Sequence, residues 1–427
     1  MDSIPYRRLF PWLNIRRAFS IARDPRNLLI ALIGLVLMSA GHTAFHTFIP
    51  KDYSRNSVSI GKPQGTANST EMNLSLDQDA EVFYIAWLRE SLTGELLEPF
   101  HQICNPAADI FFPPEGLQST WADAVTSWTL FFWNLLVWSL CGGAITRQAA
   151  SQFARQKTLS LKESLGFSRK LFVSYFSAPM LPFVAIGALY LLNFVFGLLG
   201  LIPEIGPVIV GSLWFIPLIF SLFMAIVVAC IAICWPLMYP AISVEGSDAF
   251  DGLSRSYSYL TSKPWQLAGY VLFAAVNGVI AFGIVRLMLM LTMYISIWSV
   301  TGSWSDRDSY FNTPFISDLM HESGTVNLLG SNQPGLVLIG LWVEGTRWLL
   351  HAFAYSYFWC AATIVYFVVR KSSDGTDLTE MYVPPTESPA PAASVPATTL
   401  KAVHTDAMPS LGGDGEAPQL KEPPALT

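Results

Sequence analysis

Three charged side chains interrupt long apolar stretches in the second half of this sequence. Arg286 lies within residues 265–300, and Glu344 and Arg347 lie within residues 335–369. An acid or a base inside hydrocarbon is a candidate for an ion or proton relay, because burial of its charge is unfavourable. Counted at about 1.5 Å per residue, however, all three reach the outer interface of a bilayer. We therefore favour a structural role there, such as an Arg286–Glu344 ion pair, over a relay.

A second group of charges lies in the polar stretch of residues 241–264. Four of them are close in sequence: Glu245, Asp248, Asp251 and Arg255. Clustered carboxylates can bind a cation or a basic partner. Helix capping explains them as well, because Ser247 is a favourable N-cap and acids after it lie at the positive end of the helix dipole. We expect a short interfacial helix at this elbow, with Asp251 and Arg255 paired across one turn.

No pattern of catalytic, cofactor-binding or metal-binding residues is evident. His42 and His46 share one helix face by their i, i+4 spacing, but no HExxH motif or third ligand accompanies them. The five cysteines are scattered and form no CxxC pair. Walker A, GxSxG and GxGxxG motifs are also absent from the sequence. We predict no catalytic residue, no cofactor and no metal.

The composition is typical of a membrane protein. Hydrophobic residues make up 52% of the 427 residues and charged residues only 13%, and the mean hydropathy is +0.42. Soluble domains carry about 25% charged residues. The expected fold class is an all-α membrane protein with about six transmembrane helices, interfacial amphipathic helices and a disordered C-terminal tail. The net charge of −6 argues against a nucleic-acid partner and leaves the lipid bilayer as the expected partner.

The distribution of charges predicts how the chain begins. Residues 1–27 hold six arginines and two aspartates, so we expect a basic amphipathic cytoplasmic segment before a first transmembrane helix at residues 28–49. A cleaved signal peptide has the same layout, but the cleavage pattern is poor, and we favour an uncleaved anchor. Residues 50–120 are rich in acids and are expected to form an extracytoplasmic loop, with an amphipathic helix at about residues 79–100.

Residues 121–371 are expected to form a five-helix transmembrane core that contains the elbow. The predicted spans are residues 121–145, 171–200, 208–239, 265–300 and 335–369. The last two exceed one upright span at about 1.5 Å per residue, so each is either a tilted single helix or broken, for example at Asn277 and Gly278. The basic residues of the loop at 147–170 place it in the cytoplasm.

Residues 372–427 have a different composition. They are rich in proline and acidic residues and cannot form a core, so we expect a disordered cytoplasmic tail. Both ends of the chain then lie on the cytoplasmic side. The tail and the elbow are the regions where we expect protein partners to bind.

The elbow and its flanks resemble a known group of proteins. The segments that carry the resemblance are GGAITRQAA (142–150), WPLMYPAISVEGSDAFDGLSRSYSY (235–259) and YFVVRKSSDGTDLTEMY (366–382). Over roughly residues 121–382 the chain resembles an uncharacterised family of bacterial multi-pass inner-membrane proteins, met chiefly in planctomycetes. The elbow is more distantly similar to membrane domains that accompany glycerophosphodiester phosphodiesterases. The resemblance implies the bacterial inner (cytoplasmic) membrane as location, without an established activity or catalytic residue.

Two functions follow as hypotheses. The leading one is a non-enzymatic scaffold or envelope-assembly component. The alternative is a transporter or channel for a small solute or lipid, because prolines interrupt the third and fourth predicted helices, as they do in discontinuous transport helices. A polar cavity between the third, fourth and fifth helices would favour transport, and sealed apolar packing would favour a scaffold.

Overall fold

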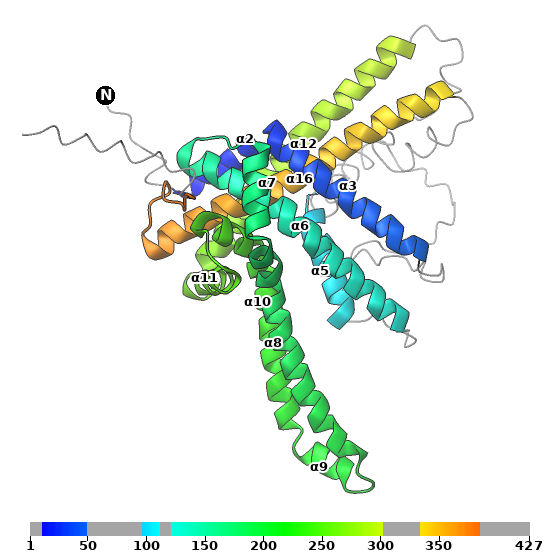
Figure 1. Cartoon of the computed structure of the whole chain (residues 1–427), viewed down its shortest axis with the longest axis vertical. Coiled ribbons are helices and arrows are strands. Elements are labelled where there is room, and N and C mark those ends of the chain that lie inside the picture. The colour runs from blue at the N-terminus through cyan, green and yellow to red at the C-terminus, as the bar shows by residue number, and fades with distance from the viewer. Residues whose placement is uncertain (1–10, 49–95, 112–120, 302–333, 385–427) are drawn as a thin grey trace, which may run out of the picture. The chain divides into compact units, whose positions relative to one another are not determined.

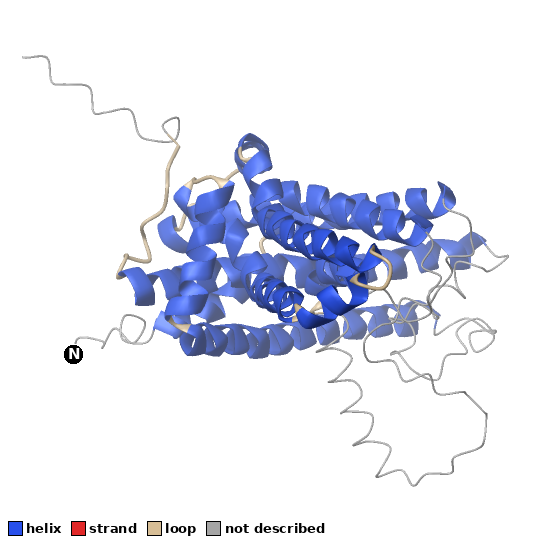
Figure 2. Ribbon diagram, turned by 90° about the horizontal axis from the view of Figure 1, so that it is seen from below, coloured by secondary structure: helices blue, strands red, loops and turns tan. Residues whose placement is uncertain are grey.

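The computed structural model describes residues 11–48, 96–111, 121–301 and 334–384. The chain divides into two compact units between Tyr382 and Val383, and nearly all of the described residues belong to the first. All regular structure in the described residues is helical (Figure 2). Within these described ranges, six helices are long and apolar enough to cross a membrane. The predicted all-α, multi-pass membrane fold is therefore confirmed.

The six long helices overlap the predicted spans, but the fourth begins at Phe215 instead of residue 208 and ends at Glu245 instead of residue 239. They are α3 (Pro25–Phe48), α6 (Trp121–Arg155), α8 (Phe172–Leu198), α10 (Phe215–Glu245), α12 (Pro264–Thr301) and α16 (Pro334–Asp374). Helices α12 and α16 are each continuous, with 38 and 41 residues, so α12 does not break at Asn277. Gly278 instead permits a close approach, because a Cβ there would lie 2.6 Å from the ring of Tyr357 on α16.

Shorter helices connect the long ones. They are η1 (Pro11–Arg16), α2 (Arg17–Ala22), α5 (Glu98–Phe111), α7 (Leu161–Lys170), η4 (Leu199–Leu201), α9 (Gly206–Ser212) and α11 (Ala249–Ser262). Helix α6 continues ten residues past Ile145, and α7 follows soon after, so the prediction of a loop at 147–170 is wrong. A capping box begins α7: the Ser160 hydroxyl accepts from the Glu163 amide, and the Glu163 carboxylate accepts from the Ser160 amide at 2.7 Å.

One end of the helix bundle is basic. Between α6 and α8 the exposed side chains include one acid, Glu163, and five bases: Arg155, Lys157, Lys162, Arg169 and Lys170. The start of α3 lies at the same end, because Gln152 of α6 donates to the Asp24 carboxylate at 2.6 Å. The last turns of α16 lie there too, with Phe367 5.1 Å from Phe153. We call this the basic end of the bundle.

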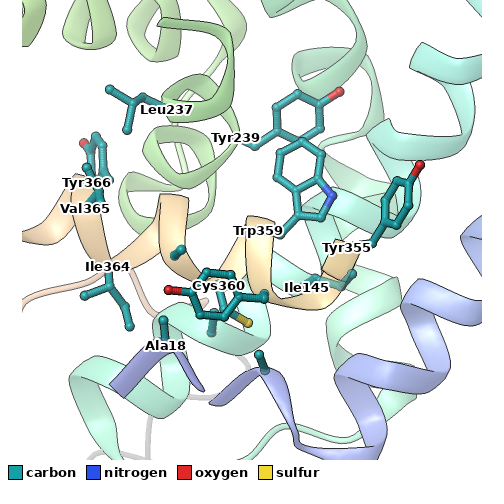
Figure 3. Close-up of a cluster of buried hydrophobic side chains, with 14 of the residues drawn as sticks. Ala18, Ile145, Leu237, Tyr239, Tyr355, Trp359, Cys360, Ile364, Val365 and Tyr366 are labelled. Atoms are coloured by element: carbon teal, nitrogen blue, oxygen red, sulfur yellow. The ribbon is translucent and has the colours of Figure 1, made fainter. Parts of the chain in front are cut away.

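Helix α16 forms the centre of the bundle. It packs against α3, α6, α10, α12, η1 and α2, and 89% of its most apolar segment is buried. Aromatic rings form much of this core (Figure 3). Trp359 lies 4.6 Å from Tyr239 of α10, and Tyr355 stacks 4.7 Å from Trp138 of α6. Gly142 of α6 leaves room for Trp359, since a Cβ at Gly142 would lie only 2.9 Å from the indole.

Helices α8 and α10 form a hairpin that is closed by η4 and α9 (Figure 1). The two helices pack on each other, yet only 6% and 0% of their most apolar segments are buried. Burial begins at the root of the hairpin, with Tyr175 on α8 and the residues from Cys234 onward on α10. The apolar length beyond the root faces its surroundings, as helices in lipid do.

The C-terminal boundary of the fold differs from the predicted one. Tyr382 belongs to the first unit: its amide donates to the Val244 carbonyl at 2.7 Å, and its ring fills the space that a Cβ at Gly246 would need. The disordered tail predicted from residue 372 therefore starts too early, because the chain there packs on the end of α10. Several predicted segments lie outside the described residues: 1–10, 49–95 with most of the amphipathic helix at 79–100, and 385–427.

Candidate functional site

Glu245, the last residue of α10, is the centre of an ion-pair network. Its carboxylate lies 2.9 Å from Arg370 Nε of α16 and accepts from the Tyr366 hydroxyl at 3.0 Å. From α11, Arg255 Nη1 approaches the same carboxylate at 3.9 Å. Arg255 Nε also lies 2.9 Å from Asp251. The structure thus brings three of the predicted residues together, Glu245, Asp251 and Arg255, and adds two from α16.

The local sequence positions this network. Helix α10 ends at Gly246, whose φ of 65° is a left-handed cap that glycine adopts without steric cost. The chain then enters α11, whose N-cap is Asp248: its carboxylate accepts from the Asp251 amide at 2.9 Å. The expectation that Ser247 is the N-cap is wrong by one residue. Both serine and aspartate suit that position, and the backbone geometry selects Asp248.

The charges of the network offset one another. Partial burial alone would lower the pKa of Arg255, but the hydrogen bond to Asp251 and the charge of Glu245 outweigh it and raise that pKa. For Tyr259, burial raises the pKa. Asp374 raises it further, and its carboxylate accepts a hydrogen bond from the Tyr259 hydroxyl at 2.6 Å. Glu245 already contacts two arginines and a tyrosine, so the network is better explained as a contact that holds α10, α11 and α16 together than as an open cation site. We call this network the latch.

A buried network around Arg147 of α6 was not predicted. Arg147 is 1% exposed, and its Nη1 donates to the carbonyls of Ser243 at 3.0 Å and Tyr382 at 2.9 Å. Its guanidinium lies 4.1 Å from the centre of the Phe167 ring of α7. The Ser243 hydroxyl lies 2.7 Å from the Tyr175 hydroxyl of α8. Arg147 therefore joins four segments of the chain. The small residues that follow it are compatible with a helix, and they could have indicated that α6 continues through this position.

Helix α5 starts inside the bundle. Leu96, just before it, lies against Gly278 of α12, and the ring of Phe100 lies 5.9 Å from that of Trp235 on α10. Gly278 is fourteen residues into α12, and Trp235 is ten residues before the end of α10. Both therefore lie about 15–21 Å from the basic end. The start of α5 is at mid-depth. The amphipathic helix predicted at 79–100, most of which lies outside the described residues, was expected to lie on the outer leaflet or to cap the helix bundle.

Polar side chains surround the start of α5. Glu98 Oε2 lies 3.2 Å from His351 Nδ1 of α16. The Asn134 side-chain amide donates to the Gln102 carbonyl at 2.9 Å, and Asn134 Oδ1 lies 2.9 Å from His42 Nε2 of α3. Sequence reasoning missed this group because α5, with only 14 residues, is too short to be recognised as a helix inside a membrane bundle. A histidine inside the apolar run of α16 was the available signal, since ionisable residues are rare there.

The remaining predicted residues lie on α12 and α16. Arg347 Nη2 donates to Glu344 Oε1 at 2.7 Å, and the Trp348 indole donates to the same oxygen at 2.8 Å. Glu344 is therefore engaged within its own helix. Arg286 of α12 is only 2% exposed, so it faces the protein and not the lipid. The Arg286–Glu344 pair stays a prediction. The seven predicted residues thus form two sets, one on α12 and α16 and the other at the elbow.

The described residues do not assemble a metal site. No three His, Cys, Asp or Glu side chains among them lie where they could jointly hold an ion. His42 contacts Asn134, and the side chain of His46 lies outside the described part. All five cysteines are free thiols. The latch around Glu245 and the Glu98–His351 pair are therefore the two candidate sites.

Comparison of the chain with known protein families, with curated proteins and with solved structures finds no match. The resemblance carried by the elbow segments accordingly stays a prediction. What the protein does is therefore argued from its own geometry.

Proposed function

We propose that this protein is a non-enzymatic scaffold, or an envelope-assembly component, of the bacterial inner membrane. The observation that carries the proposal is the α8–α10 hairpin. At its root, Tyr175 and Ser243 join α8 to α10, and Arg147 joins them to α6. Beyond the root, Tyr190 and Val195 are 62% and 54% exposed. A firmly rooted apolar hairpin is suited to presenting its surface to other membrane proteins.

The packing of the third, fourth and fifth spans supports a scaffold over a transporter. Helices α8 and α10 pack on each other, whereas α12 packs along α16. A pathway between these spans would require them to enclose a common cavity. Four prolines of α8 and α10 lie within continuous helices and not at breaks: Pro179, Pro182, Pro236 and Pro240. The fifth, Pro217, lies in the first turn of α10, just after the turn that separates α9 from α10.

The charge distribution supports a topology with both chain ends in the cytoplasm. The basic end carries five exposed bases and one acid between α6 and α8. Such ends face the cytoplasm by the positive-inside rule. Six spans return the chain to the side on which it began. In a chain whose five native cysteines are replaced by serine, Lys157→Cys should therefore react with a membrane-impermeant thiol reagent only in opened cells, and labelling in intact cells would overturn this topology.

Photocrosslinking in living cells tests the scaffold proposal. A photoreactive amino acid replaces Val195 on the hairpin in one variant and Val36 on α3 in another, because the two side chains are similarly exposed, at 54% and 50%. We expect Val195 to give discrete crosslinks to other proteins and Val36 to give far fewer. Crosslinks confined to lipid at Val195 and at further hairpin positions such as Phe223 would refute the proposal.

A transporter is the second candidate, and the Glu98–His351 pair is the observation that favours it. An acid and a base inside the helix bundle, with His42 and Asn134 nearby, are the kind of groups that relay protons in transport proteins. Solute flux into proteoliposomes decides between the two functions. Saturable flux that Glu98→Gln abolishes and Glu204→Gln leaves intact would replace the scaffold proposal with this one.

A further inference from the structure

A pocket of about 410 Å³ lies at the basic end of the bundle, between α2 and the end of α6. Six residues line it: Arg17, Ser20, Ile21, Gln152, Gln156 and Thr158. The first three come from α2, and the last three come from the final turn of α6 and the residues after it. Neither the latch nor the Glu98–His351 pair contributes to this pocket.

The lining is suited to an anion. A guanidinium, two hydroxyls and two carboxamides can all donate hydrogen bonds, and none of the described residues that line the pocket is acidic. Arg17 is held over the ring of Phe153 at 5.0 Å, which orders its guanidinium. One lining residue contacts an acid: the Gln152 side chain donates to Asp24 at 2.6 Å, and Asp24 also accepts from the Arg26 amide at 3.0 Å.

The surroundings add positive charge. The residues that flank the lining in sequence include the exposed bases Arg16, Arg23, Arg155 and Lys157. A guanidinium with several neutral donors around it matches the tetrahedral oxygens of a phosphate group. The fixed negative end of the α6 dipole opposes an anion here, so the bases must outweigh it.

Gln156 occupies an unusual backbone conformation at this site. Its φ is 55°, the left-handed region that helix C-terminal caps usually assign to glycine. A residue with a Cβ is less favourable than glycine at such a φ. Gln156 therefore places a carboxamide in the lining of the pocket, although glycine would stabilise this end of α6 more.

The position of the pocket favours a lipid headgroup as its occupant. Ile21 lies four residues before the start of α3 at Pro25, and Gln152 to Thr158 lie where α6 leaves its apolar span. Phosphates of lipid headgroups lie at this level of a bilayer, and basic pockets between membrane helices bind anionic headgroups. We propose that this pocket binds the phosphate group of an anionic phospholipid.

Thermal unfolding of the full-length protein in a neutral detergent tests the assignment. Short-chain phosphatidylglycerol should raise the Tm in a concentration-dependent way, because a ligand that binds only the folded state stabilises it. Short-chain phosphatidylcholine and inorganic phosphate should give much smaller shifts. Equal shifts with phosphatidylcholine would overturn the anion assignment, and equal shifts with inorganic phosphate would overturn the lipid assignment.

Two variants and one control locate the binding. Arg17→Gln should weaken the apparent affinity for phosphatidylglycerol about tenfold, because a charge-assisted hydrogen bond is lost. Gln156→Gly should also weaken it, while the Tm without lipid stays equal or rises, so a folding defect cannot imitate the result. Arg169→Gln removes an exposed charge from α7 at the same end and should leave the affinity unchanged. If Gln156→Gly binds as the parent does, or if Arg169→Gln weakens binding as much as Arg17→Gln, the pocket is not the site.

Discussion

Helix α16 and the α8–α10 hairpin differ in burial, and the difference is the opposite of what their hydropathy alone would predict. Over their most apolar segments, α10 has a mean hydropathy of 2.9 and α16 only 1.6, yet α10 is 0% buried there and α16 is 89% buried. Lipid accepts any apolar surface, whereas a helix at the centre of a bundle also needs aromatic and polar groups to fix its neighbours. The less apolar helix is therefore the core of this protein, and the more apolar pair is its exposed part.

The largest expected effect comes from breaking a charged contact in the bundle. Glu245→Gln leaves Arg370, whose side chain is 7% exposed, without its acidic partner. We expect the free energy of unfolding to fall by about 3 kcal/mol. Ser221→Ala is the hairpin control, because it removes only an exposed contact with Asn193 at 3.2 Å and should cost less than about 1 kcal/mol. Equal losses in chemical denaturation would mean that both regions depend on polar contacts alike.

A pair of glycines provides the next comparison. Gly142→Ala places a Cβ 2.9 Å from the Trp359 ring and should destabilise the protein by about 1–3 kcal/mol. Gly187→Ala on α8 meets no atom within 4 Å and gains helix propensity, so its Tm should be unchanged or slightly higher. A loss of stability at Gly187 comparable with that at Gly142 would show that α8 is packed and not open.

A smaller loss of stability is expected for α5. Glu98→Gln weakens the contact with His351 and should lower the free energy of local opening of α5 by about 1 kcal/mol. In a variant that keeps Cys104 as the only cysteine, this thiol should react several-fold faster with a membrane-permeant maleimide, since Cys104 lies on α5 against Trp235. Glu204→Gln in the hairpin turn is the matched control. No change in the Cys104 rate would argue that the pair does not hold α5.

The smallest effect concerns α7, which leads from the bundle into the hairpin. Hydrogen bonds from the Ser160 amide and hydroxyl lower the pKa of Glu163 below its ordinary 4.5. The carboxylate therefore stabilises the folded state above that pH, and its contribution is lost as the pH falls through the lowered pKa. Hydrogen-exchange protection of the first turn of α7 should decline in that range. Ser160→Ala should show low protection at every pH, and pH-independent protection in the parent would contradict the capping role.

The sequence was sufficient for the spans but not for their contacts. Apolar runs located all six long helices, because length and hydropathy decide which segments cross a bilayer. Arg147 was assigned to a loop, since counting basic residues does not reveal whether a helix continues through them. The interior position of α5 depends on contacts with Trp235 and His351, far away in the chain. Periodicity within 14 residues carries no such information.

The elbow shows the same limit at closer range. The pairing of Asp251 with Arg255 follows from one helical turn, so local spacing was enough to predict it. The contact of Glu245 with Arg370 joins residues 125 positions apart, and it forms only because α10 and α16 end side by side. Local rules therefore identified the charges but not the partner that makes them a latch.

Oxygen accessibility of spin labels in reconstituted protein tests most directly whether these two regions differ. One label replaces Val195 on α8 and another replaces Ile364 on α16, which is fully buried. Oxygen concentrates in the hydrocarbon of a bilayer, so a lipid-facing label relaxes faster in its presence. The structure predicts strong oxygen broadening at Val195 and little at Ile364. Equal shielding of the two labels would mean that the hairpin folds against its own bundle, and it would contradict a hairpin available to partners.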